Sequence, residues 1–70
     1  MNFDQLKKLE TKYKGFLSRF KYVTSTKVQT NEHNKWVIWI CYKKGLSIQE
    51  KKEIATEMGD IPLKFHEETA

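Results

Sequence analysis

Residues 20–42 read FKYVTSTKVQTNEHNKWVIWICY and contain two runs rich in Val, Ile, Thr and aromatic residues. These residue types favour pleated, half-buried β-strands. The runs extend from Phe20 to Gln29 and from Lys35 to Tyr42. The segment between them, residues 31–34, is polar and typical of a turn. The sequence therefore predicts an antiparallel β-hairpin.

Ahead of the hairpin, apolar residues recur at spacings of three and four, which predicts an amphipathic helix with one stripe facing a core. The stripe consists of Phe3, Leu6, Leu9, Tyr13, Phe16, Leu17 and Phe20. Asn2 is a suitable N-cap, and Asp4 lies in the first turn, where a carboxylate interacts favourably with the helix dipole. We therefore expect this helix to pack on the hairpin.

A second helix is predicted after the hairpin. Ser47 and Glu50 have the spacing of a capping box, and Gly59 is a suitable stop for the helix. Beyond it, residues 61–65 alternate apolar and other residues, which predicts a short third strand. Pro62 would confine that strand to an edge of the sheet. We expect residues 66–70 to be frayed.

The chain has 70 residues, so we expect one domain covering residues 1–70. Its predicted class is α+β: a two-layer fold of helix, β-hairpin, helix and short third edge strand, with both helices on one face of the sheet. Cys41 is the only cysteine, which excludes an internal disulfide and is typical of a reducing compartment. The N-terminus has neither a basic start nor an apolar run, so we expect a cytoplasmic protein.

Positive charge is concentrated in the first part of the chain. Residues 1–30 carry seven positive and two acidic side chains, a net charge of +5, whereas the whole chain has a net charge of +4. The first predicted helix contributes a possible basic patch of Lys7, Lys8, Lys12 and Lys14. Such an excess can attract nucleic acid or an acidic protein, although a lysine-rich surface is also common on solvated helices.

Side chains alternate across a strand, so the hairpin sequence sorts them onto two faces, provided that neither strand contains a bulge. The more apolar face should receive the helices and holds Phe20, Tyr22, Thr24, Thr26, Val28, Trp36, Ile38, Ile40 and Tyr42. We call the other side of the sheet the open face. Its predicted members are Lys21, Val23, Ser25, Lys27, Gln29, Lys35, Val37, Trp39, Cys41 and Lys43.

The predicted open face resembles a binding surface, because an apolar centre lies inside a charged rim and Trp is a frequent anchor. The centre consists of Trp39, Val37, Val23 and Cys41, and the rim of Lys21, Lys27, Lys35 and Lys43. Three binding interpretations are open: a homodimer, another protein partner, or single-stranded nucleic acid stacked on Trp39. In a fourth interpretation the C-terminal segment covers Trp39, and Trp39 belongs to the core.

The sequence offers no set of residues suited to catalysis, to a metal or to a cofactor. His33 and Cys41 lie too far apart along one strand to act together. We therefore expect no enzyme and no membrane protein, but a binding protein. Our first hypothesis is a small regulator or inhibitor, of the kind common in phages and mobile elements, that occupies a partner protein's surface. The alternative is a nucleic-acid-binding protein that uses the basic hairpin face and the first helix.

Overall fold

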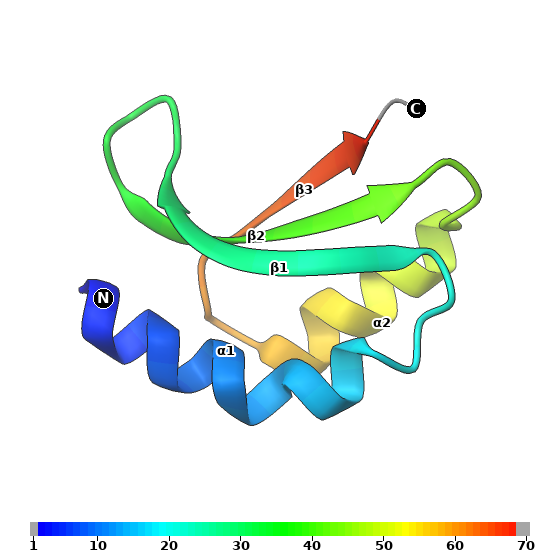
Figure 1. Cartoon of the computed structure of the whole chain (residues 1–70), viewed down its shortest axis with the longest axis horizontal. Helices are drawn as coiled ribbons and strands as arrows, with labels where there is room; N and C mark the ends of the chain where they lie inside the picture. The colour runs from blue at the N-terminus through cyan, green and yellow to red at the C-terminus, as the bar shows by residue number, and fades with distance from the viewer. Residues whose placement is uncertain (1, 69–70) are drawn as a thin grey trace.

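The computed structural model describes residues 2–68, and it confirms the predicted α+β class (Figure 1). The elements follow in the order α1 (Phe3–Leu17), β1 (Val23–Thr30), β2 (Trp36–Lys43), α2 (Ile48–Met58) and β3 (Leu63–Glu68). The strands form one three-stranded sheet in the order β1-β2-β3. The central strand β2 is the most apolar of the three, as expected for a strand with neighbours on both sides.

Strands β1 and β2 form the predicted antiparallel hairpin, with one irregularity in β1. Thr30 pairs with Trp36 and Ser25 with Cys41, but Val23 pairs with Tyr42. The register therefore shifts at Thr24, which is the extra residue of a β-bulge. Because a one-residue shift moves a side chain to the other face, Val23 joins the side of Tyr42. The bulge thus changes the predicted faces only at the start of β1.

Strand β3 lies parallel to β2 and follows it through α2, so the three elements form a β-α-β unit. Leu63 pairs with Ile38 and Glu68 with Lys43. The strand is at the edge of the sheet, as predicted from Pro62, whose carbonyl accepts the N–H of Ile38. The prediction of a frayed tail is wrong for residues 66–68, because the parallel pairing continues to Glu68; residues 69–70 lie outside the described range.

Both helices begin with a capping box. In α2, Ser47 accepts the N–H of Glu50, and the Glu50 carboxylate accepts the N–H of Ser47, as the sequence predicts. In α1 the same exchange joins Asn2 and Gln5. Each box satisfies two main-chain donors that the first turn of a helix leaves free. The caps fix where the helices start and hence how they approach the sheet.

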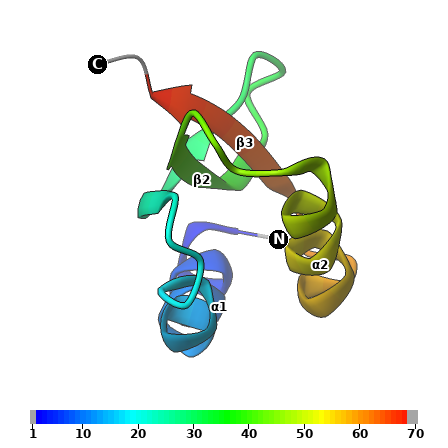
Figure 2. The same ribbon diagram turned by 90° about the vertical axis from the view of Figure 1, so that its right-hand side faces the viewer.

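The helices cover one face of the sheet, and the core lies between the two layers (Figure 2). The buried core residues are Leu6, Leu17, Val28, Ile38, Ile40, Ile54 and Met58. Every element except β3 contributes at least one of them, and Leu63 and Phe65 of β3 pack against this cluster while partly exposed. Neither helix in residues 2–68 has the length and apolar character required to span a lipid bilayer.

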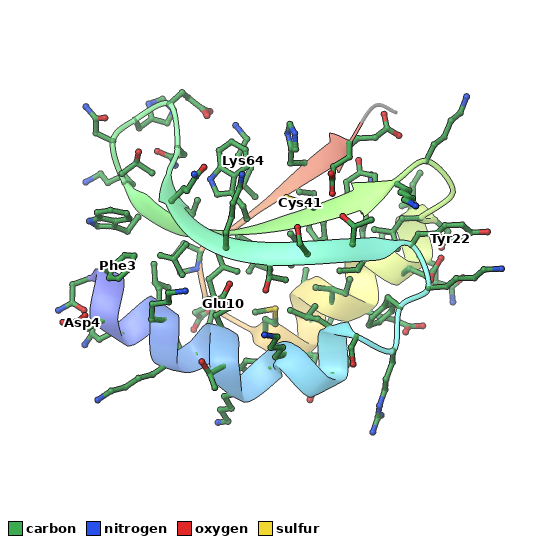
Figure 3. All side chains as sticks on the ribbon, viewed as in Figure 1. Phe3, Asp4, Glu10, Tyr22, Cys41 and Lys64 are labelled. Atoms are coloured by element: carbon green, nitrogen blue, oxygen red, sulfur yellow. The ribbon has the colours of Figure 1, made fainter. Side chains whose placement is uncertain are left out.

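Trp36 is on the predicted helix-facing side but stands at its end, where it is 41% exposed. Its ring meets that of Phe3 edge-to-face, with the centroids 5.2 Å apart. Phe3 is itself 39% exposed at the start of α1 (Figure 3). The first residue of β2 and the first turn of α1 therefore form a partly exposed aromatic pair rather than a closed core.

Candidate functional site

The open face of the sheet is the side away from both helices (Figure 2). Strand pairing places Trp39 at its middle, between Lys27 of β1 and Lys64 of β3. The other residues in the same alternating rows are Ser25, Gln29, Val37, Cys41, Lys43, His66 and Glu68. The face thus has a third row, from β3, that the hairpin alone does not predict.

Two lysines lie over Trp39, and we call Lys27 and Lys64 the lysine pair. The Nζ atom of Lys27 is 5.2 Å from the Trp39 ring centroid, and that of Lys64 is 4.9 Å from it. Both distances allow a cation–π interaction, worth roughly 0.5–1 kcal/mol at an exposed site. Trp39 and Lys64 are half-buried, whereas Lys27 is exposed.

Lys64 also forms an ion pair with a residue of the hairpin turn. Its Nζ donates to a carboxylate oxygen of Glu32 at 3.1 Å, and Lys64 is labelled above the sheet in Figure 3. The pKa of Glu32 is lowered by its own backbone amide, by the hydrogen bond and charge of Lys64, and by nearby His33. Glu32 therefore favours its ionised form and links the hairpin turn to β3.

The Trp39 indole has a second ring beside it and an unpaired donor. The His66 and Trp39 centroids are 5.3 Å apart, with the planes tilted by 47°. The indole Nε1 atom of Trp39 is buried and has no hydrogen-bond partner among residues 2–68. A buried donor left unpaired costs about 1–3 kcal/mol, so this N–H is suited to an additional acceptor.

The Cys41 end of the open face is covered by a polar bridge. The Thr24 hydroxyl, at the bulge, lies within hydrogen-bond distance of both the Cys41 carbonyl oxygen and the Glu68 carboxylate. Glu68 belongs to β3, so the bridge crosses the central strand from one edge strand to the other. Cys41 is only 4% exposed. Its thiol is therefore a packing group, as a small buried cysteine commonly is.

The predicted apolar centre is thus only partly correct. Trp39, Val37 and Cys41 share the open face, but Val37 is as buried as Cys41 and is not part of an exposed centre. The prediction for Val23 is wrong: the Thr24 bulge turns it toward the helices, where it packs against the core. The more exposed of the two tryptophans is Trp36, not Trp39.

The predicted lysine rim is spread more widely than strict alternation of side chains along the two strands implies. Lys27 and Lys43 are exposed on the open face. Lys35 is exposed in the turn before β2. Lys21 is exposed before β1, where its Nζ lies 5.7 Å from the Tyr22 ring centroid. Lys27 is thus the predicted rim residue that contacts Trp39, and Lys64 completes the lysine pair.

The basic patch of α1 is separate from the open face. Lys7 forms an ion pair with the buried carboxylate of Glu10 at 3.2 Å, and the others, Lys8, Lys12 and Lys14, are exposed. The sheet lies between the open face and α1 (Figure 2). The two basic regions therefore do not form one continuous surface.

The described residues contain no cluster of three His, Cys, Asp or Glu side chains placed to hold a metal ion. His33 is exposed in the hairpin turn, whereas Cys41 is buried under the Thr24 bridge. Comparison of the chain with models of protein families, with curated proteins and with solved structures finds no significant match.

Proposed function

We propose that the chain is a non-enzymatic binding protein, a small regulator or inhibitor whose open face docks on an acidic surface of a partner protein. The observation that carries the proposal is the lysine pair over Trp39. An aromatic residue at the middle of a helix-free face, with two cations beside it, combines the two features that binding surfaces use: a central anchor and a charged rim.

The chemistry of this cluster favours carboxylates. Two ammonium groups lie over one ring and Glu32 pairs with Lys64, so an incoming carboxylate can pair with Lys27 and share Lys64 with Glu32. Below them, the unpaired Trp39 N–H can donate to a second acidic or carbonyl oxygen when the lysines shift. Electrostatic complementarity of this kind increases the association rate and excludes partners with basic surfaces.

Nucleic acid is the alternative, and His66 beside Trp39 is the observation in its favour, because it adds a second ring. Two other observations weigh against it. The lysine pair covers the Trp39 ring, so a base has to displace both side chains before it can stack. The α1 patch, with Lys8 and Lys12, lies beyond the sheet and does not extend the open face.

Affinity capture with matched variants tests the proposal. The full chain is immobilised and exposed to nuclease-treated extract of the cells that express it, beside a Lys27→Glu/Lys64→Glu variant. A Lys8→Glu/Lys12→Glu variant makes the same change of charge on α1. We expect a protein that is retained by the wild type and by the α1 variant and lost from the open-face variant. Equal loss from both variants contradicts the assignment of the site.

Salt titration distinguishes the alternative. Single-stranded DNA and RNA are titrated with the Trp36→Phe variant, in which Trp39 is the remaining fluorophore. Phosphate contacts make affinity fall by orders of magnitude as salt rises when six or more contacts form. Quenching of Trp39 together with that steep fall would replace the protein partner by nucleic acid. We expect no quenching at physiological salt.

A further inference from the structure

The outer edge of β1 has no neighbouring strand in the described chain, because the sheet order is β1-β2-β3. The N–H of Asn31 donates to the carbonyl of Lys35. This bond determines which residues of β1 direct their main-chain N–H and C=O groups toward β2. In an antiparallel pair every second residue bonds to its neighbour, here Gln29 and Lys27. The main-chain N–H and C=O groups that point away from the sheet therefore belong to Thr26, Val28 and Thr30.

Beyond the Thr24 bulge, this edge has few of the features that usually prevent strand association. Proteins protect an edge with proline, with charges, with a β-bulge or with a short strand. Strand β1 is eight residues long, contains no proline, and has Lys27 as its one charged residue. The opposite edge strand, β3, is shorter, follows Pro62 directly, and carries Lys64, Glu67 and Glu68. The two edges of this sheet thus differ sharply in how they resist pairing.

We propose that a second copy of this chain pairs along β1, antiparallel to it, with the two-fold axis at Val28. The segment Thr26-Lys27-Val28-Gln29-Thr30 is nearly symmetric about Val28. In this register Val28 faces Val28 of the second copy, and each Thr26 faces Thr30 of the second copy. Thr–Thr is a favourable cross-strand pair, and Val is well suited to a strand.

The register also keeps like charges apart on the open face. Lys27 faces Gln29 of the second copy, so the lysines are not directly opposed. Moving the axis by one residue, to Lys27, would oppose like charges. In that register Lys27 would form a non-hydrogen-bonded pair with Lys27 of the second copy, which is the position where opposed side chains lie closest. The arrangement centred on Val28 is therefore favoured over the one centred on Lys27, because it keeps the two lysines apart.

Pairing of this kind joins the two sheets into one and keeps both open faces on the same side. It is held together by main-chain groups at the edge, so it does not depend on the proposed function. It also adds buried surface to a chain of 70 residues, a size at which a single core supplies only about 3–5 kcal/mol. A dimer would present two copies of the lysine pair to one partner surface.

Sedimentation measurements on charge variants test the interface. Thr26→Lys/Thr30→Lys places like charges opposite each other across the axis, whereas Thr26→Glu/Thr30→Lys places opposite charges there and disturbs the same positions. We expect the wild type and the second variant to sediment as dimers and the first as a monomer, with all three folded by circular dichroism. A wild-type monomer at every concentration overturns the proposal.

Disulfide trapping tests the register, in a Cys41→Ala background. Directly opposed residues of an antiparallel pair lie within the Cα separation that a disulfide requires. We expect a mixture of Lys27→Cys and Gln29→Cys chains to form a mixed covalent dimer far faster than either variant forms one alone. A dimer that does not give this mixed product, or that dissociates on Trp39→Ala and not on Thr26→Lys/Thr30→Lys, overturns the proposal.

Discussion

Replacing Lys64 tests the packing of the open face directly. Lys64→Ala removes one of the two cations over Trp39 and the alkyl chain that shields the ring. The cation–π contact accounts for about 0.5–1 kcal/mol at a half-exposed site, and loss of shielding adds to it. The exposed ion pair with Glu32 adds little to the free energy of unfolding, because solvent screens it. We therefore expect the free energy of unfolding to fall by about 1 kcal/mol.

Urea unfolding and acrylamide quenching of Trp39, both in a Trp36→Phe background, provide the two readouts. Lys64→Ala should lower stability and raise the quenching constant, whereas Lys64→Met should lower stability and leave quenching nearly unchanged because its side chain still covers the ring. Lys52→Ala, on the exposed side of α2, is the control for loss of a lysine. Equal quenching in Lys64→Ala and Lys52→Ala would refute the described cover of Trp39.

Three further outcomes follow from the core, the caps and the turn. Ile40→Ala empties a fully buried site and should cost about 2–5 kcal/mol, enough to unfold much of so small a domain in urea-free buffer, whereas Ile40→Val should cost about 0.5–1.5 kcal/mol by urea titration. Ser47→Ala removes the α2 cap and should cost about 1 kcal/mol, while the neighbouring exposed Gln49→Ala should cost much less. The pKa of Glu32 is lowered by folding, so its stabilising effect is present above its ordinary pKa of 4.5 and is lost as pH falls through the folded-state pKa; Glu32→Gln should flatten this part of the acid unfolding curve.

Local patterns predict most of this fold. Helix periodicity, the Ser47–Glu50 capping box and the polar turn at residues 31–34 each determine an element through neighbours in sequence, and the structure confirms all three. Pro62 likewise indicates an edge strand because it lacks a main-chain donor. These features require no knowledge of distant contacts.

The open face is harder to predict, because it depends on pairing between distant segments. Nothing in the sequence around Thr24, such as a glycine, marks the bulge that moves Val23 to the core side. The row from β3 that brings Lys64 and His66 beside Trp39 exists only because residues 63–68 return parallel to β2. Alternation within the hairpin therefore predicts the positions of Trp39 and Lys27, but it does not predict that Lys64 and His66 lie beside them.

The affinity of the captured partner for two tryptophan variants tests the central claim most directly. Trp39→Ala removes the proposed anchor, and Trp36→Ala removes an exposed tryptophan near the other side of the sheet. Isothermal titration should give a loss of about 2 kcal/mol or more, some 30-fold, for Trp39→Ala and little change for Trp36→Ala. Both variants must remain folded by circular dichroism, with Trp39→Phe as the milder substitute. Loss of binding in Trp36→Ala with wild-type affinity in Trp39→Ala would contradict the claim that the open face is the binding site.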